Sequence, residues 1–160
     1  MTGGGGRDFA WILERELERL AREIEAYPSE AALWSTRGGQ KNPPGTLALH
    51  LVGNLSHFVG AGLGGTAYVR DRTAEFTERD VPRAELLARI EACRETVTDV
   101  LESLEDSALA GVYPAEPPAG MEGITTRALL LHLTWHLGWH LGQIYYHRVG
   151  AGEEAVGASR

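Results

Sequence analysis

Apolar side chains recur every three or four positions in four stretches of this chain, with charged and polar residues between them. The first stretch runs from Phe9 to Tyr27, preceded by Asp8 as the expected N-cap and followed by Pro28. Because this spacing gathers the apolar residues on one face of an α-helix, each stretch predicts an amphipathic helix. The other three predicted helices cover residues 46–62, 81–104 and 125–150.

The segments between these helices are rich in residues that end helices. A short helical turn is expected over residues 28–34, and the Gly-, Asn- and Pro-rich residues 35–45 predict a loop. Four glycines between residues 60 and 65 end the second helix, so the polar stretch 66–80 is expected to be an ordered loop rather than a helix. Asp80 is the expected N-cap of the third helix.

The last connection, residues 106–123, is rich in proline and too long for a tight turn, and Thr125 is expected to cap the fourth helix. Four amphipathic helices with long connections, and no convincing strand or repeat, predict an all-α four-helix bundle. The 160 residues fit a single domain over residues 8–150, flanked by a flexible tip at 1–7 and a flexible tail at 151–160.

The charge balance narrows the range of partners. A net charge of -7, from 22 acidic and 15 basic residues, opposes binding to a polyanion, so neither nucleic acid nor an anionic membrane is expected as a partner. No apolar run approaches the roughly 20 residues needed to span a bilayer, and the first residues lack a secretion-signal pattern. The single cysteine, Cys93, excludes an intrachain disulfide and is read as a buried apolar residue. A cytoplasmic protein is expected.

Histidines are concentrated in the fourth predicted helix. His132, His136 and His140 are spaced by four residues, so they lie along one stripe of the helix, with His147 and Gln143 in the same stripe. Apolar and aromatic residues surround them, and a buried imidazole without a partner is costly. A bound metal ion is one such partner, because two imidazoles four residues apart can bind one divalent ion.

One helix cannot place three of its own residues around an ion with good angles, so another helix is expected to supply the third ligand. The second predicted helix carries His50 and His57, which are seven residues apart and lie on nearly the same face. At this point either of them is a candidate ligand. The i,i+4 spacing also leaves open whether His132 or His140 pairs with His136.

Two motifs resemble those of the DinB/YfiT-like family of metal-binding four-helix bundles. The first is HLGWHLGQ over residues 136–143, and the second is TLALHLVGNL over residues 46–55; the GNLSHF and GGTAYVRDR stretches also resemble a subgroup of the family. The resemblance implies that His50, His136 and His140 form a three-histidine metal site. Members often have His or Arg after the last ligand, where this chain has Leu141.

Several neighbouring residues have two interpretations. Gln143 is expected either to hydrogen-bond a bound ligand or to brace the site. Arg70 and Arg72 are expected either to bind a carboxylate above the metal or to pair with acidic neighbours such as Asp71 and Glu75. His57 and His132 are candidates to support the site or plain core residues, and His147 is expected near the surface. Trp135 and Trp139 are interpreted as a hydrophobic wall of the site or as an interface.

Three neutral imidazoles suit zinc or nickel first, and iron or cobalt next, and leave a coordination position open. An ion there would lower the pKa of a bound water or thiol. The resemblance implies metal-dependent chemistry on a small-molecule substrate, with transfer of a low-molecular-weight thiol as the leading reaction and hydrolysis as another, and frequent homodimers. Leu137 stands where a helical zinc protease needs Glu, and no catalytic residue is assigned. The alternative is a metal-binding or stress-response protein without turnover.

Overall fold

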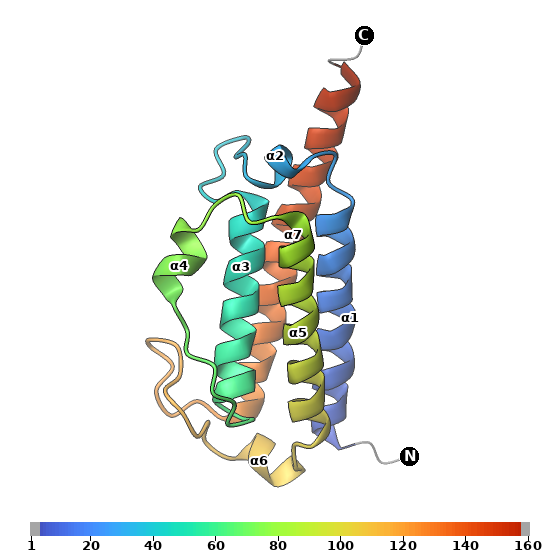
Figure 1. The fold of residues 1–160 in the computed structure, drawn as a ribbon. Helices are drawn as coiled ribbons and strands as arrows, with labels where there is room; N and C mark the ends of the chain where they lie inside the picture. The colour runs from blue at the N-terminus through green and yellow to red at the C-terminus, as the bar shows by residue number, and fades with distance from the viewer. Residues whose placement is uncertain (1–3, 158–160) are drawn as a thin grey trace.

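The computed structural model describes residues 4–157, with side chains described through Gly152. Helices make up the secondary structure of these residues, which contain no strand, so the all-α prediction is confirmed. The four longest helices lie side by side (Figure 1), and shorter helices fill their connections. The elements in chain order are α1 (Gly5–Glu25), α2 (Glu30–Leu33), α3 (Pro44–Leu55), the π-helix η1 (Ser56–Ala61), α4 (Arg72–Thr77), α5 (Arg83–Glu102), α6 (Asp106–Ala110) and α7 (Thr126–Gly157).

One continuous apolar core joins the four long helices. The residues that predicted the amphipathic faces are the ones that are buried, among them Leu13, Leu17 and Leu20 of α1 and Ile90 and Val97 of α5. Each fully buried leucine, isoleucine or valine contributes about 1.5–3 kcal/mol to folding by leaving water. Burial of these faces therefore fixes the bundle, and the connections adapt to it. No described helix is both long enough and apolar enough to cross a membrane.

The first helix begins earlier than its sequence pattern indicates. The prediction of Asp8 as N-cap is wrong, because α1 begins at Gly5 and Asp8 lies in its first turn. The backbone N–H of Gly5 donates to the Asp106 carboxylate at 2.6 Å, so a side chain from α6 satisfies this helix end. A Cβ on Gly6 would meet the Leu101 carbonyl oxygen, so this glycine permits close packing of α1 on the end of α5. Residues 1–3 of the expected flexible tip lie outside the described residues.

The polar stretch 66–80 contains a helix that the sequence analysis did not expect. The Asp71 carboxylate accepts a hydrogen bond from the backbone N–H of Ala74 at 2.8 Å and caps α4. Asp80 does not cap the next helix, as had been expected. Its φ of 56° places it in the left-handed region, and α5 begins three residues later, after Pro82. Helix α6 likewise begins the proline-rich crossing, which was expected without one.

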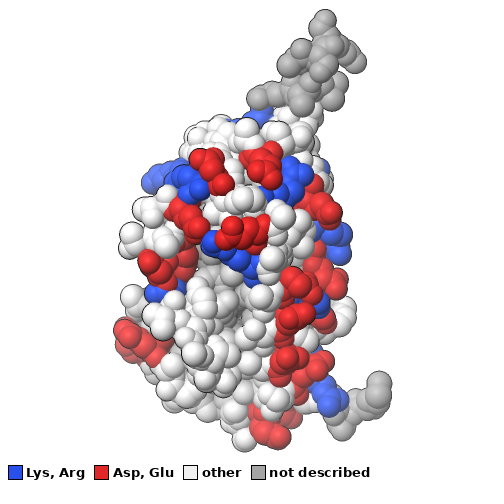
Figure 2. Space-filling view, in the orientation of Figure 1, with Lys and Arg blue, Asp and Glu red and all other residues white. Residues whose placement is uncertain are grey.

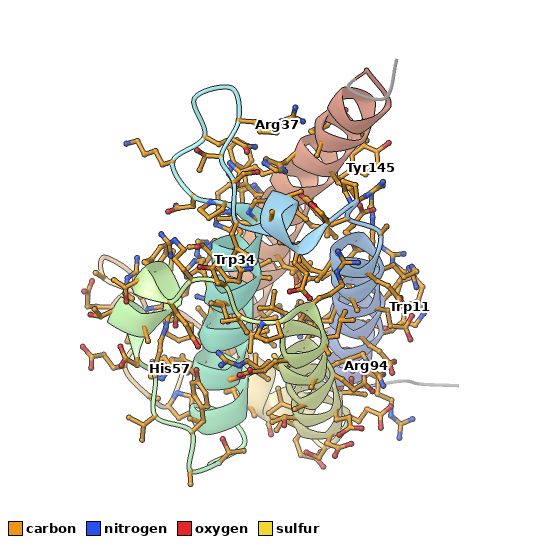
Figure 3. All side chains as sticks on the ribbon, turned by 45° about the horizontal axis from the view of Figure 1, so that its top comes forward. Trp11, Trp34, Arg37, His57, Arg94 and Tyr145 are labelled. Atoms are coloured by element: carbon orange, nitrogen blue, oxygen red, sulfur yellow. The ribbon has the colours of Figure 1, made fainter. Side chains whose placement is uncertain are left out.

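The second long helix changes its winding at Ser56, before the glycines at residues 60–65. Helix α3 begins at Pro44 and gives way at Ser56 to the π-helix η1, which carries His57. The Tyr113 hydroxyl, from the proline-rich crossing, donates to the Phe58 carbonyl oxygen at 2.8 Å. At the other end of α3, Trp34 lies over Gly45, where a Cβ would come within 2.7 Å of the indole ring (Figure 3). Contacts from distant segments therefore hold both ends of this helix.

Helix α7 has the predicted start but a later end. The Thr125 hydroxyl accepts from the backbone N–H of Ala128 at 3.2 Å, as expected of its cap. The helix then continues past the expected end near Gly150 to Gly157, so residues 151–157 of the predicted tail are helical. The guanidinium of Arg37 packs 2.9 Å from the position of a Cβ on Gly150, which supports the helix at that point. Residues 158–160 lie outside the described residues.

Candidate metal centre

Three histidines converge between α3 and α7. His50 comes from α3, and His136 and His140 come from α7, so that a ring nitrogen of each lies within 4.8 Å of the other two. The Nε2 atoms of His50 and His136 are 3.2 Å apart. The ring centroids of His136 and His140 are 4.6 Å apart, with the rings nearly perpendicular. Converging nitrogen donors from two facing helices are what a divalent ion with three imidazole ligands requires.

The orientation of His50 is fixed by a carboxylate that the sequence analysis did not assign to the site. The Nδ1–H of His50 donates to Oε2 of Glu75 at 2.9 Å, because a carboxylate can only accept. The Nε2 atom of His50 therefore keeps its lone pair and faces the other two histidines. A carboxylate behind a metal-binding histidine fixes its tautomer and raises its basicity.

Glu75 is itself held by an arginine. Arg70 donates to both carboxylate oxygens of Glu75, at 2.6 Å and 2.9 Å, in a two-pronged pair that is almost wholly buried. Burial alone would raise the pKa of Glu75, but the hydrogen bonds from His50 and Arg70 outweigh it and hold that pKa below its ordinary value. Arg70 thus pairs with an acidic neighbour, which was one of the two alternatives for it. It acts on His50 through Glu75, the carboxylate that both residues contact.

A glycine makes room for this carboxylate. A Cβ on Gly53, one turn after His50 on α3, would overlap the carboxylate of Glu75. Any residue with a side chain at position 53 would therefore prevent Glu75 of α4 from packing against α3 at this position. Gly53 is thus part of the arrangement that orients His50.

The histidines of α7 complete the fit to a metal ion. Nδ1–H of His140 donates to the side-chain oxygen of Gln143 at 2.8 Å, which leaves Nε2 of His140 free to face the site. Gln143 therefore braces a histidine, and it also borders the adjoining cavity. Within the described part of the chain, the buried Nδ1 of His136 has no hydrogen-bond partner. The donor set suits zinc, nickel, iron or cobalt.

The family of the chain follows from its sequence as a whole. The sequence model of the DinB superfamily matches residues 12–144, which include all three histidines and most of the bundle. The chain belongs to the DinB superfamily. The resemblance to DinB/YfiT-like proteins is thereby confirmed, and the helical fold agrees with it. No curated protein and no solved structure matches this chain.

The protonation states of the histidines in this DinB protein allow them to bind a cation. Burial, together with the neighbouring His140 and His50, lowers the pKa of His136 to about 3. Burial also lowers the pKa of His140, partly opposed by its hydrogen bond with Gln143. At neutral pH these two imidazoles are therefore uncharged, and only the uncharged ring has a lone pair for a metal.

A polar cavity of about 410 Å³ opens beside His140. Its walls are His140, Gln143, Leu47 and the loop 38–42, which includes Lys41. The sequence analysis treated this loop only as a connection. Lys41 is the only lysine of the chain and is exposed, so it adds a positive charge to the wall of this cavity.

The other histidines and the tryptophans lie outside the cluster. The ring of His132 stacks 6.1 Å from that of His136, and His57 lies on η1. The expectation that His147 lies near the surface is wrong: its side chain is 3% exposed, and its Nδ1 is 3.1 Å from the Tyr27 hydroxyl. Trp135 and Trp139 are 59% and 58% exposed and do not border the cavity beside His140. Arg72 lies over the Phe76 ring.

The lowered pKa of His136 predicts how the stability of the metal-free protein depends on pH. Between the ordinary histidine pKa of 6.5 and a pKa of about 3, the unfolded chain binds a proton on this ring that the folded chain does not. The free energy of unfolding therefore rises with pH in this window. The stabilising contribution of His136 is fully present above pH 6.5 and is lost as the pH drops toward 3. Urea unfolding in EDTA from pH 7.5 to pH 4 should show a falling midpoint.

The replacement His136→Gln should reduce this pH dependence, because one of the shifted groups is gone. The matched control is His132→Gln on the same helix, which should keep the slope of the parent protein. Equal slopes in the parent and the His136→Gln protein would contradict the assignment of the effect to His136.

Proposed function

We propose that this protein binds one divalent metal ion through His50, His136 and His140 and uses it to activate a low-molecular-weight thiol for transfer to an electrophile. The observation that carries the proposal is the shared orientation of the histidines. Two of the three hold their Nδ1 protons in hydrogen bonds to Glu75 and Gln143, which leaves their Nε2 atoms with lone pairs for an ion. When bound there, the ion supplies Lewis acidity that favours loss of a proton by a thiol or a water.

The residues around the centre would bind and orient the reactants. The cavity beside His140 admits a small molecule next to the histidines, and Gln143 lines it with an amide. Lys41 at the same cavity would attract a carboxylate on the thiol or on the electrophile. In the proposed reaction the S–H bond breaks, a sulfur–carbon bond forms, and the leaving group departs with the electron pair of its bond. The thiol proton is lost to solvent or substrate.

The metal content tests the first half of the proposal. About one divalent ion per chain is expected in the parent protein, because three imidazoles form one site. The replacements His50→Ala and His136→Ala should each weaken binding at least about tenfold, since each removes a ligand. Elemental analysis by mass spectrometry after dialysis measures the content, with zinc and nickel expected before iron and cobalt. His132→Ala is the matched control and should retain the ion; full metal content in both ligand variants would refute the site.

Thiol-dependent turnover tests the second half. The metal-loaded protein should accelerate the reaction of a thiol such as cysteine, glutathione or coenzyme A with an activated aryl halide, followed by absorbance. His140→Ala should reduce this rate to the uncatalysed level, whereas His132→Ala should keep it. Metal binding without turnover across a broad panel of thiols and electrophiles would favour the alternative, a metal-binding or stress-response protein that is not an enzyme.

We further propose that the chain forms a homodimer in the cytoplasm and that α7 supplies the contact. Leu131, Trp135, Trp139 and Tyr146 recur at helical spacing, and each is more than half exposed. Gly138 and Gly142 lie on the same side of the helix, where a Cβ would meet open space. A stripe of large apolar residues beside glycines suits close packing of one helix against another.

Pairing through this stripe predicts a dimer mass in solution. Light scattering at micromolar concentration should give twice the mass of the chain. The double replacement Trp135→Ser and Trp139→Ser should give the monomer mass, because it removes the two largest side chains that the proposed dimer would bury. Trp11→Ser is the matched control, because Trp11 is 60% exposed but lies on α1. A monomer mass for the parent protein would refute the dimer.

A further inference from the structure

A second cavity lies between α3, α4 and α5, and none of the three histidines lines it. Its volume is about 650 Å³, and its wall on α3 is formed by Leu49, Val52, Gly53 and Ser56. In Figure 2 an uncharged, hollowed area lies on this face of the molecule, beneath a row of acidic and basic side chains. The segment 66–71 borders the cavity on the side away from α5.

The inside of this cavity is mostly apolar. Alanines at positions 67, 74 and 92 and the bare backbone of Gly53 keep the space open, and larger apolar side chains complete the walls. Two of these, Tyr68 and Val69, are 39% and 87% exposed at its border. Apolar side chains left in water around an apolar cavity favour a ligand that covers them.

The walls are tied together, so the cavity does not depend on a ligand to form. Arg89 of α5 donates to both carboxylate oxygens of Glu78, just after α4, each at 3.0 Å. The Cys93 thiol of α5 lies 3.8 Å from the Val52 carbonyl oxygen of α3. A preformed cavity loses little conformational entropy when it binds.

The charged groups of the lining are already paired with one another or with their neighbours. Asp71 caps α4, Glu75 bonds His50 and Arg70, and Glu78 pairs with Arg89. Three carboxylates face one guanidinium among the lining residues, so the cavity disfavours an anion and offers no unpaired charge to a cation. Burial raises the pKa of the Cys93 thiol to about 11, so the thiol stays protonated and does not attack a ligand.

We infer that this cavity is a binding site for an uncharged, mostly apolar small molecule, such as an aromatic or alicyclic compound. Its volume falls within the roughly 300–1,000 Å³ of sites that enclose drug-sized ligands. The cavity is built by residues other than the metal ligands, so the inference does not rest on the proposed function. The ligand is held by apolar contact and by exclusion of water, and the uncharged polar residues of the lining are Ser56, Thr66, Tyr68 and Thr96.

The test uses the full chain and a neutral probe, N-phenyl-1-naphthylamine, whose fluorescence increases in apolar surroundings. The parent protein should bind one probe per chain, with or without EDTA. The replacements Val52→Trp on α3 and Ala74→Trp on α4 fill the cavity from two walls and should each weaken binding at least tenfold. Ala84→Trp, at an exposed position of α5 outside the cavity, should leave binding unchanged. Circular dichroism establishes that each variant is folded.

Three results would overturn the inference. The first is no saturable binding by the parent protein. The second is unchanged affinity in whichever of the two filled variants folds. The third is loss of binding in Trp135→Ser with retention in the filled variants, which would place the probe on the exposed face of α7. An anionic naphthalene sulfonate should bind at least tenfold more weakly than the neutral probe; tighter binding of the anion would also count against the inferred ligand class.

Discussion

The ion pair between Glu75 and Arg70 is the interaction on which the histidine centre depends. A carboxylate that is 6% exposed can remain charged only if its lost hydration is replaced, and burial of an unpaired charge costs several kcal/mol. Arg70 replaces that hydration with two hydrogen bonds, and His50 adds a third. The same carboxylate then orients His50 toward α7. The packing of α4 and the absence of a side chain on Gly53 both allow the Glu75 carboxylate to lie against α3.

The long helices could be predicted because their apolar period is carried by their own residues. Helix α4 could not, since its six residues contain too little of a helical period to be recognised in a polar stretch. Its stability comes from the Asp71 cap and from the burial of Glu75 against α3, which are contacts with residues far from any local pattern. Tertiary contacts also decide the start of α1, where Asp106 satisfies a backbone N–H that the local sequence leaves without a partner.

The histidine cluster could be predicted in part from the sequence. Spacing alone placed His132, His136 and His140 on one stripe, and only the resemblance to known motifs chose His136 and His140 with His50. The structure brings these three together, while His132 stacks on His136 at the edge. Glu75 was missed as a site residue because it reaches His50 from a helix that was not expected. The burial of His147 was missed because its partner, Tyr27, lies 120 residues away in the chain.

Glu75 also connects the two cavities of the molecule. Its carboxylate bonds His50, and the residue lines the apolar cavity between α3 and α5. A ligand in that cavity that moves the carboxylate must therefore change the basicity and the orientation of His50. By thermodynamic linkage, a metal ion on His50 would then change the affinity of the cavity for such a ligand by the same factor.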